Sequence, residues 1–459
     1  MISYCDFLHF FEKKSKIFFL GVGGVSMSAL AFVSKNAGLE AAGYDAMTTE
    51  LTEKLERAGI PVSHEFSEKD YAGVDAVVYT GAIHDTDPVL SYPRSLGIPE
   101  MTRAEFLGYL MRKSPNPIGV SGTHGKSTTT GFLASIFCRA RRDPTVMIGA
   151  EMTALGGTYR EGAGDDFIFE ACEYQDSFLH FFPRIAVILN CEHDHADYFP
   201  TLDDVIDSFV KFADLAKDGY AVFNRDDPGA VRAAQRTIAP VKYYSMNEKC
   251  DLWCENLVSE NGFYRFTIAS PDEKFEVKLH VPGRHNVSNA LAAALAARLS
   301  GVETEAIREG LEAFGGVKRR FEYRGKCGGY DVFDDYAHHP DEIRATLSAA
   351  RELGYEKITV VFQSHTFTRT KAYWDDFVSS LSLADEVITA DIYPAREEPI
   401  PGVTAENLAK AIPGGEYFGD FRAIANELRS RREKGLLIIM GAGSVIHLTD
   451  LILTERHGA

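Results

Sequence analysis

The sequence predicts an α/β fold of three consecutive domains, and three observations lead to this prediction. Short apolar segments such as 16–20 and 76–80 alternate with Gly-containing turns and helical segments along most of the chain. This alternation is typical of parallel sheets that helices cover on both faces. The 459 residues exceed what one hydrophobic core usually holds. In addition, two segments rich in Pro, Gly and charged residues interrupt the alternation.

These two interruptions define the predicted domain boundaries. Segment 113–117, KSPNP, and segment 315–320, GGVKRR, contain residues that commonly end helices and strands. We therefore predict a Rossmann-like N-terminal domain over residues 1–113 and a central P-loop-type ATPase α/β domain over 114–317. A Rossmann-like C-terminal domain follows over 318–459.

Each domain has its own predicted elements. In the N-terminal domain, a small-residue helix over 27–37 follows the first strand. The strands expected in the later domains are 118–121, 166–170, 184–190, 220–224, 330–334, 357–363, 386–391 and 436–440. A β-rich stretch over 241–281 precedes a helix over 285–300. Because ligands of open α/β sheets bind beyond the carboxyl ends of the strands, residues directly after the strands are the candidates for a site.

Composition excludes some classes of protein. The formal charge of −18 argues against a nucleic-acid-binding protein, which needs a basic surface. The seven cysteines follow no disulfide or zinc pattern, which favours a reducing compartment. No segment approaches about 20 consecutive apolar residues, and the N-terminus does not resemble a signal peptide. We therefore predict a cytoplasmic protein that does not span a membrane.

The clearest chemical signal is a phosphate-binding loop over residues 122–127, GTHGKS, between a predicted strand and a predicted helix. Glycines let backbone N–H groups point at an anion, and the helix N-terminus adds partial positive charge. Lys126 can reach the terminal phosphates, and the Ser127 hydroxyl suits Mg²⁺. Val120 stands where the longer form of the motif has glycine, so the loop is a compact variant. The alternative, a turn that only caps the helix, leaves Lys126 unused.

Two further strands of the central domain end in groups that suit a metal ion. The residues that follow these strand ends are Glu170, Glu173 and Asp176 in one segment, and His193, Asp194, His195 and Asp197 in the other. If both strands are parallel neighbours of strand 118–121, all three strand ends open onto one crevice. Phosphoryl transfer needs cations near the phosphates, so the sequence predicts a magnesium site there. The HDHAD segment is also similar to zinc hydrolase motifs, but Tyr198 stands where those continue with histidine.

A second glycine-rich loop follows the first strand. Gly21, Gly23 and Gly24 precede a helix, and Asp45 lies about 20 residues further on, as in a dinucleotide-binding fingerprint. Ser26 replaces the third glycine of that fingerprint. The loop fits a ligand that carries a diphosphate, either NAD or a sugar nucleotide, and its plainer interpretation is a strand-to-helix turn.

Taken together, the order of these motifs resembles the Mur ligase family from about residue 16 to the C-terminus. The segments that carry the resemblance are FFLGVGGVSMSALA, GVSGTHGKSTTTG, FEACEYQDSFLHF, NCEHDHADYF, PGRHNVSNALAA, KRRFE, DDYAHHPDEI, VFQSHTFTRT and GAGSVIHL. The resemblance implies that the first domain binds a UDP-sugar and the central domain binds ATP. It also implies that the third domain closes over both and brings the amino acid. Within the family, the chain is most similar to members that add L-alanine to UDP-N-acetylmuramate in peptidoglycan synthesis.

The resemblance also implies roles for individual residues. ATP would be held by Gly122, Thr123, His124, Gly125, Lys126, Ser127 and Thr128, with Asn286 and Asn289 at the adenine and Asp335 at the ribose. Mg²⁺ would be held by Ser127, Glu170 and His195. The UDP-sugar would be held by Gly21, Gly23, Gly24, Asp45 and Arg103. The residues expected to act in catalysis are Lys126, Glu173, Arg320, His365 and Arg369, of which the last two attend the incoming amino acid.

Some positions depart from the family pattern or allow plainer roles. Ser127 stands where Thr is usual and Ser364 where Pro is common. Thr366 stands where many members have Arg, which removes a possible partner for the amino-acid carboxylate. His338 and His339 could cap or pack instead of binding a ligand, and Arg320 could belong to a solvated linker.

The implied function leaves three alternatives. A sister ligase of the same family attaches a peptide instead of L-alanine and recycles cell-wall fragments. An NAD-dependent oxidoreductase built on the first glycine loop leaves Lys126 unexplained. A nucleotide-binding regulator without catalysis would use the phosphate loop as a switch.

Overall fold

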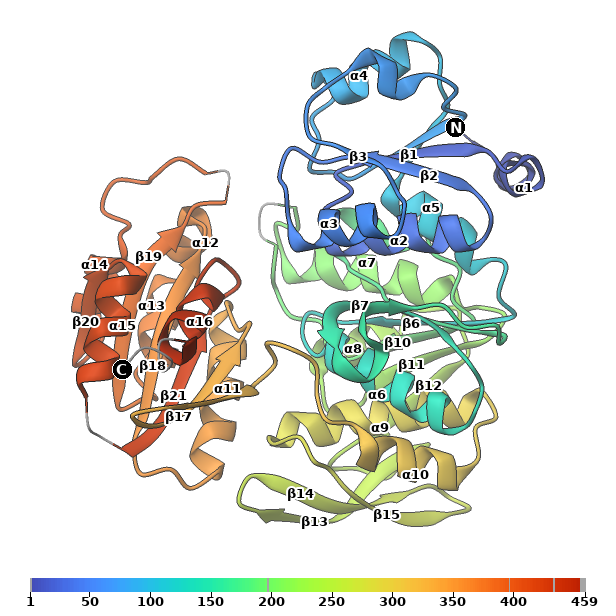
Figure 1. Ribbon diagram of the computed structural model, residues 1–459. Helices are drawn as coiled ribbons and strands as arrows, with labels where there is room; N and C mark the ends of the chain where they lie inside the picture. The colour runs from blue at the N-terminus through green and yellow to red at the C-terminus, as the bar shows by residue number, and fades with distance from the viewer. Residues whose placement is uncertain (1, 196–197, 396, 432–433, 455–459) are drawn as a thin grey trace. The chain divides into compact units, whose positions relative to one another are not determined.

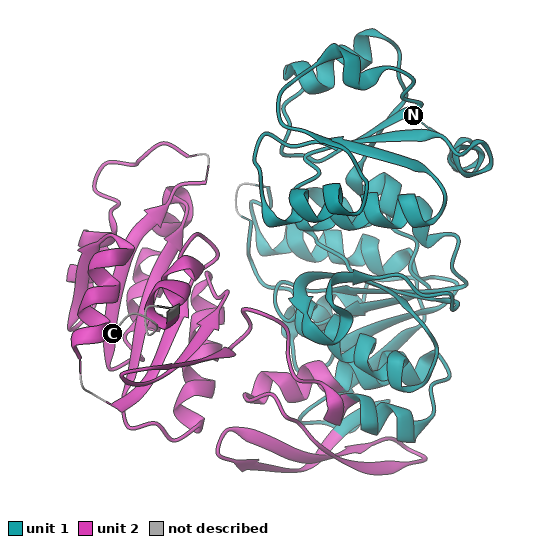
Figure 2. Ribbon diagram, viewed as in Figure 1, with its two compact units in different colours: residues 1–253, 291–310 teal, residues 254–290, 311–459 magenta. Residues whose placement is uncertain are grey.

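The computed structural model describes residues 2–195, 198–395, 397–431 and 434–454 (Figure 1). These residues form two compact units, coloured separately in Figure 2. Unit 1 comprises Met1–Trp253 and Leu291–Gly310, and unit 2 comprises Cys254–Ala290 and Leu311–Ala459. Among the described residues, no helix is both long and apolar enough to cross a bilayer.

Unit 1 begins with a parallel sheet in the order β3-β2-β1-β4-β5. Its strands are β1 Lys16–Leu20, β2 Glu40–Tyr44, β3 Val62–Ser63, β4 Ala76–Tyr79 and β5 Glu100–Thr102. The helices of this region are α1 Tyr4–Lys13, α2 Val25–Asn36, α3 Glu50–Arg57, α4 Pro88–Ser95 and α5 Arg103–Met111. The central position of β1 and the parallel order confirm the Rossmann-like prediction.

Helix α2 lies between two sheets, which explains its small residues. It contacts β2 of the first sheet and also β7 and β8 of the next one. Its residues 27–34 are all buried. Small side chains such as Ala29 and Ala31 let a helix approach both neighbours closely. The small-residue helix predicted from the sequence is therefore a packing layer between two parts of unit 1.

The second sheet of unit 1 carries the phosphate loop. Its strands run in the order β12-β11-β10-β6-β9-β7-β8, and β12 also pairs with the start of β13. They are β6 Asn116–Ser121, β7 Thr145–Met152, β8 Gly157–Arg160, β9 Asp166–Glu170, β10 Ile185–Ile188, β11 Tyr220–Asn224, β12 Val241–Ser245 and β13 Leu252–Glu260. The helices that accompany these strands are α6 Lys126–Arg139, α7 Leu202–Asp214 and α8 Pro228–Ala234. Strands β9 and β10 are both parallel neighbours of β6, as the sequence predicts.

The first interruption differs from the prediction in one detail. Asn116 and Pro117 already belong to β6, although the segment was predicted to separate domains. The Asn116 side-chain amide donates to Asp166 Oδ1 at 2.7 Å, and the carbonyl of Pro117 accepts from Arg184 N at 2.8 Å. Pro117 can occupy a strand because its bond to Arg184 uses its carbonyl group, which proline retains.

Unit 2 contains a hairpin and a third sheet. The hairpin pairs β14 Phe263–Ala269 with β15 Lys274–Lys278, and it precedes α9 Arg284–Leu299 and α10 Thr304–Ala313. The third sheet has the order β16-β17-β21-β18-β19-β20 and is parallel except for the β16–β17 pair. Its strands are β16 Glu322–Cys327, β17 Gly329–Asp335, β18 Ile358–His365, β19 Glu386–Tyr393, β20 Gly415–Gly419 and β21 Lys434–Met440.

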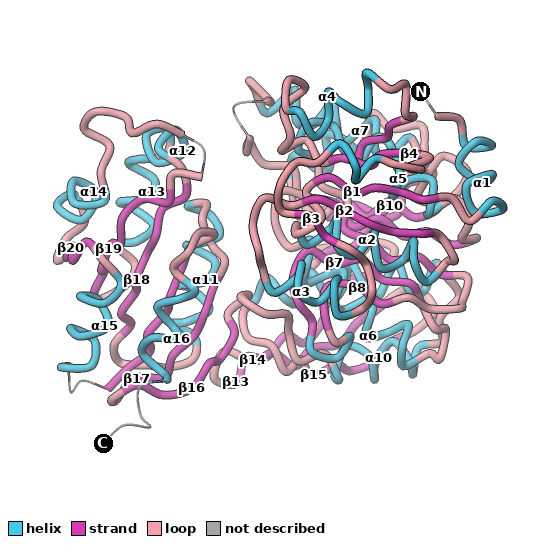
Figure 3. The backbone as a smooth tube through the Cα atoms, turned by 45° about the horizontal axis from the view of Figure 1, so that its top comes forward, coloured by secondary structure: helices cyan, strands magenta, loops and turns pink. Residues whose placement is uncertain are grey.

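Helices cover both faces of this third sheet (Figure 3). They are α11 Pro340–Glu352, α12 Phe367–Ala372, α13 Trp374–Leu381, α14 Ala405–Ala411, α15 Phe421–Ser430 and α16 Ile446–Thr454. The sequence did not predict β16 and β20, because most residues of these edge strands are polar or glycine, and most are at least partly exposed. The three sheets confirm the three-domain α/β prediction, and the domain limits at 113 and 317 stay predictions.

Candidate active site

The phosphate loop depends on two glycines at its ends. Gly122 has a φ of 142°, and a Cβ atom there would lie 2.9 Å from Leu189 Cβ. Gly125 has a φ of 87° and is the N-cap residue of α6. Both conformations lie in the left-handed half of the φ range, which favours glycine. The backbone therefore turns sharply from β6 into α6 only because these two positions lack a side chain.

The end of β10 holds this loop in place. Asn190 accepts from His124 N at 2.8 Å through Oδ1, and its amide donates to the His124 carbonyl at 3.2 Å. The Thr123 hydroxyl accepts from Glu192 N at 2.9 Å and donates to the Glu192 carbonyl at 3.2 Å. The loop after β6 and the segment after β10 are thus joined directly, which confirms that the ends of these neighbouring strands meet.

Lys126 folds back over the loop and pairs with Glu173. Its Nζ donates to the carbonyls of Gly122 at 2.5 Å and Thr123 at 3.1 Å, and lies 3.1 Å from Glu173 Oε2. The Glu173 side chain is only 3% exposed. Burial acts to lower the pKa of Lys126, but Glu173, with smaller contributions from Cys172 and Glu170, raises it above its ordinary value. The sequence identified both residues as catalytic but did not predict that they pair.

Glu173 also approaches His195, so three predicted site residues come together in unit 1. His195 Nε2 lies 3.8 Å from Glu173 Oε1, and the His195 ring packs against Tyr174 with centroids 4.7 Å apart. Glu170 ends β9, where its Oε1 accepts from Gly149 N at 2.6 Å. Ser127 is buried in the first turn of α6. Asp197, the last acidic residue predicted in this region, lies outside the described residues.

The donor set on these strand ends fits a magnesium ion. The Ser127 hydroxyl and the Glu170 carboxylate supply the hard oxygen ligands that Mg²⁺ prefers, and the binding of one ion by these two residues and His195 stays a prediction. His193 Nε2 lies 2.9 Å from the carbonyl of Phe199, so this ring shapes its own loop. That contact agrees with a hydrogen-bonded loop at His193 and weakens the zinc interpretation of HDHAD.

The first glycine loop lies at the end of β1, as predicted, and Asp45 contacts it. Gly23 N donates to Asp45 Oδ2 at 2.8 Å, and a Cβ atom on Gly23 would lie 2.7 Å from the same oxygen. Glycine is required here because the carboxylate approaches the backbone so closely. Arg103 donates to the hydroxyl of Ser26 at 3.1 Å, and burial lowers the pKa of its guanidinium group. Arg103 therefore lies beside the helix that this loop opens.

The remaining predicted residues belong to unit 2. Asn286 and Asn289 are buried near the start of α9. The Asn286 amide donates to the carbonyl of Pro282 at 2.7 Å, and that of Asn289 donates to Asn286 Oδ1 at 3.2 Å. These bonds orient both side chains. Their predicted contact with adenine stays a prediction.

Asp335 fixes the linker that contains Arg320. Its carboxylate accepts from Phe321 N at 2.8 Å and from Ala337 N at 2.7 Å. Arg319 and Phe321 have positive φ angles of 59° and 52°, which non-glycine residues adopt rarely. Burial raises the pKa of Asp335 to about 6, although Arg320 and the two N–H groups act to lower it. This carboxylate therefore holds a strained linker in one conformation.

Asp335 gives a pH-dependent contribution to stability that can be measured. The pKa of Asp335 is about 6 in the folded protein, and its ordinary value is 3.8. The folded protein therefore binds this proton more tightly than the unfolded chain does. Stability should therefore fall as pH rises through this window, by on the order of 3 kcal/mol relative to an Asp335→Asn variant. Urea unfolding of both proteins between about pH 4 and 7 measures the difference. Asn at the exposed Asp375 of α13 is the control, and an equal pH trend in that control would contradict the assignment.

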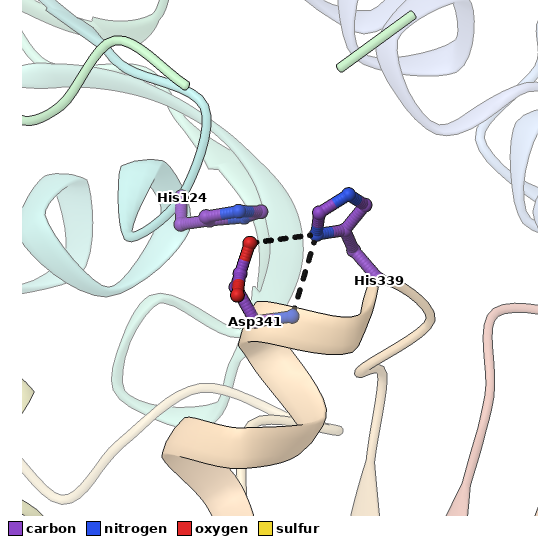
Figure 4. Close-up of side chains that lie close together, drawn as sticks. All are labelled: His124, His339 and Asp341. Atoms are coloured by element: carbon purple, nitrogen blue, oxygen red, sulfur yellow. Dashed lines mark hydrogen bonds and ion pairs between the residues drawn. The ribbon is translucent and has the colours of Figure 1, made fainter. Parts of the chain in front are cut away.

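His339 acts as a helix cap, which is one of the roles left open by the sequence. It is the N-cap residue of α11, and its Nδ1 accepts from Asp341 N at 3.4 Å (Figure 4). His124, also labelled in that view, belongs to the phosphate loop of unit 1. His338 Nδ1 lies 3.0 Å from the carbonyl of Tyr336, and burial lowers the pKa of His338 to about 4.

The residues expected at the amino acid lie at the end of β18. His365 is the last residue of that strand, and its ring stacks on Tyr393 with centroids 5.5 Å apart. Burial, and then the nearby Arg369, lower the pKa of His365 below 6.5. Thr366 has a φ of 68° and is the N-cap of α12, where its hydroxyl accepts from Arg369 N at 3.4 Å. Thr366, which stands where many family members have Arg, therefore caps α12 and positions its first turn, which contains Arg369.

The sequence interpretation missed Glu342, which contacts Arg320. Glu342 Oε1 lies 3.6 Å from Arg320 Nη1, and Oε2 accepts from the backbone N–H groups of His338 and His339. Arg320 also lies over the ring of Tyr336, 5.2 Å from its centroid. The position of Glu342 three residues after the N-cap His339 is the spacing of a capping box, and this signal could have identified it.

Comparisons with known proteins identify the family of this chain and agree with its fold. Three family models match: the catalytic domain of the Mur ligase family over 16–115, the Mur ligase middle domain over 120–297, and the Mur ligase glutamate ligase domain over 319–443. A UDP-N-acetylmuramate–L-alanine ligase of Caldicellulosiruptor saccharolyticus is 42% identical over 449 residues, which cover 96% of this chain and 99% of that protein.

Solved structures agree as well. The UDP-N-acetylmuramate-alanine ligase MurC of Thermotoga maritima has a TM-score of 0.81 and 27% identity, and the match covers 95% of this chain and 97% of that one. A murein peptide ligase of Psychrobacter arcticus has a TM-score of 0.74 and 24% identity over 96% of this chain and 98% of that one, and so shares its fold. The chain belongs to the Mur ligase family.

Proposed function

We propose that this protein is an ATP-dependent ligase that joins L-alanine to UDP-N-acetylmuramate in peptidoglycan precursor synthesis. The observation that carries the chemistry is Lys126, held at the ends of β6 and β9 by loop carbonyls and Glu173. We assign the substrates from the name of the relative that is 42% identical over nearly the whole chain. Because ATP and UDP-sugars are cytoplasmic metabolites, we place the reaction in the cytoplasm.

In this proposal, residues 122–128 bind the phosphates of ATP. The N–H groups of the glycine turn and the N-terminus of α6 face the anion. Asn286 and Asn289 orient the adenine, and Asp335 holds the ribose. Magnesium would be held by Ser127, Glu170 and His195, and when bound it supplies positive charge to the phosphate oxygens. The UDP-sugar would lie against the loop of Gly21, Gly23 and Gly24, with Asp45 and Arg103 beside it.

The reaction proceeds in two displacements. The muramate carboxylate attacks the γ-phosphorus of ATP, and the bond between this phosphorus and the β-phosphate oxygen breaks. The products of this step are an acyl phosphate and ADP. The amine of L-alanine then attacks the acyl carbon, and inorganic phosphate leaves. Lys126 exchanges its partner Glu173 for the phosphate oxygens, which offsets the repulsion between two approaching anions. Arg320 contributes a second cation from its linker.

The amino acid requires a base for its ammonium group and a binding partner for its carboxylate. L-Alanine arrives as an ammonium ion, whereas only the neutral amine can attack. His365 is neutral at pH 7 because burial and Arg369 lower its pKa, so its ring can accept a proton from the ammonium group. Arg369, in the first turn of α12, can pair with the carboxylate of the amino acid.

Phosphate release from ATP, Mg²⁺ and UDP-N-acetylmuramate tests the proposal, with L-alanine or the tripeptide of the recycling reaction in separate samples. We expect release only with L-alanine, together with a product of the corresponding mass. Release only with the tripeptide would support the recycling ligase instead. Turnover that depends on the sugar substrate excludes a regulator without catalysis, and absence of NAD binding excludes the oxidoreductase.

A further inference from the structure

The turn after β9 contains a strained pair of residues beside the proposed site. Gln175 and Asp176, in the 3₁₀ segment Tyr174–His180, have φ angles of 55° and 54°. His195, on the facing loop, has a φ of 54°. Non-glycine residues adopt this conformation rarely, and such strain persists where surrounding contacts determine it fully. The contacts that determine it converge on Asp176.

Asp176 joins three segments of unit 1. Its Oδ2 accepts from the hydroxyl of Tyr198 at 3.0 Å, and its Oδ1 accepts from the hydroxyl of Ser208 on α7. Its backbone N–H donates to the carbonyl of Glu173 at 2.9 Å. A carboxylate suits this position because both facing hydroxyls donate to it. Asp176 thus ties together the Glu173 turn, Tyr198 and helix α7.

Tyr198 extends this connection to His195. Tyr198 N donates to the carbonyl of His195 at 2.8 Å, so the residue that Asp176 holds is itself bonded to the backbone of His195. From the other side, Tyr174 packs on the His195 ring, 4.7 Å between centroids. His195 Nε2 then faces Glu173 Oε1 at 3.8 Å. Loss of the bond between Tyr198 and Asp176 would therefore loosen the hold on the backbone of His195 and on the orientation of its ring.

We propose that Asp176, through Tyr198, is the positioning residue that holds the ring of His195, a proposed ligand of the divalent cation, in its orientation toward Glu173. This inference rests on the proposed function for the identity of the cation site. Asp176 itself touches neither nucleotide nor metal in this scheme. Its carboxylate acts on His195 only through the hydrogen bond to Tyr198, whose backbone N–H donates to the carbonyl of His195.

Tyr198→Phe is the sharpest test because it removes one hydroxyl and keeps the ring that packs against Tyr174 and Phe199. The measurement is the affinity of the whole enzyme for the Mn²⁺ complex of a non-hydrolysable ATP analogue, followed by electron paramagnetic resonance. We expect the affinity to fall about tenfold, as for the loss of a partner that orients a metal ligand. The Mg²⁺ concentration that gives half the maximal rate should rise similarly, and the KM for L-alanine should not change.

Tyr355→Phe is the matched control. The Tyr355 hydroxyl donates to Asp331 Oδ2 at 3.0 Å, so the substitution removes the same kind of bond at the same distance in unit 2. We expect its Mn²⁺ affinity to equal that of the wild type. Asp176→Asn is the conservative variant, since asparagine keeps one acceptor and tolerates a positive φ, and it should retain part of the affinity. If Tyr198→Phe shows no cooperative unfolding transition and so does not fold, Ser208→Ala takes its place. This variant removes the other hydroxyl that donates to Asp176.

Two results would overturn this inference: unchanged Mn²⁺ affinity in folded Tyr198→Phe, or an equal loss in Tyr355→Phe. The proposed function can fail separately. If the wild type binds the Mn²⁺–nucleotide complex but forms no product from L-alanine, the ligase proposal fails and the positioning role of Asp176 is still tested by binding. If the wild type forms product and Tyr198→Phe binds the complex normally, only the positioning role is wrong.

Discussion

Replacing Lys126 with alanine is expected to lower kcat by about 10³-fold, since a cation that stabilises charge in the transition state contributes on that scale. Lys126 belongs to the phosphate loop, where its Nζ lies 3.1 Å from Glu173 Oε2 and donates to two loop carbonyls. Its removal leaves the two approaching anions of the reaction without this neutralising charge. Phosphate release at saturating substrates measures the loss. A folded variant with nearly full activity would show that Lys126 has no role in the reaction.

The same substitution also affects stability, and a paired variant separates the two effects. Glu173 is only 3% exposed, so the loss of Lys126 leaves a buried carboxylate without its cation. Breaking one side of a buried ion pair typically costs about 3–5 kcal/mol. The double variant Lys126→Met with Glu173→Gln removes both charges, and we expect it to recover most of this stability in urea unfolding. Its activity should stay as low as that of Lys126→Ala, which would show that the loss of rate does not arise from the loss of stability.

Arg320→Ala should produce a loss of similar size, about 10³-fold in kcat, as for arginines that clamp transferring phosphoryl groups. Arg320 is preorganised because Glu342 lies 3.6 Å from its Nη1 and the ring of Tyr336 lies beneath its guanidinium group. Steady-state phosphate release, with L-alanine varied separately, measures kcat and the KM for the amino acid. We expect the KM to change little, because this arginine serves the phosphates.

Arg344→Ala provides the control for Arg320. Arg344 lies on α11, where its Nε is 3.3 Å from Asp341 Oδ1. The substitution removes an arginine–carboxylate pair of the same unit, and we expect wild-type activity. Activity of Arg320→Ala within a factor of about ten of the control would contradict a phosphate clamp, given the size of effect expected for such a residue.

Local patterns were sufficient to predict most of the elements and the chemical residue types. Alternation of apolar strands with helices predicted the parallel sheets, because side-chain periodicity and the turn residues act over a few positions. The glycines of the phosphate loop predicted a sharp turn, and Gly122 and Gly125 do adopt positive φ angles. The edge strands β16 and β20 were missed because an edge position tolerates polar residues that carry no strand signal.

The sequence by itself determined which groups are available: Lys126 after one strand, Glu173 after a second and His195 after a third. Only the tertiary structure decided that β9 and β10 flank β6, so that Lys126 pairs with Glu173 and Glu173 faces His195. It also decided that Asp335 holds the linker of Arg320. The physical reason is that these contacts join residues far apart in the chain. Their geometry depends on strand order and on buried hydrogen bonds, which no local pattern specifies.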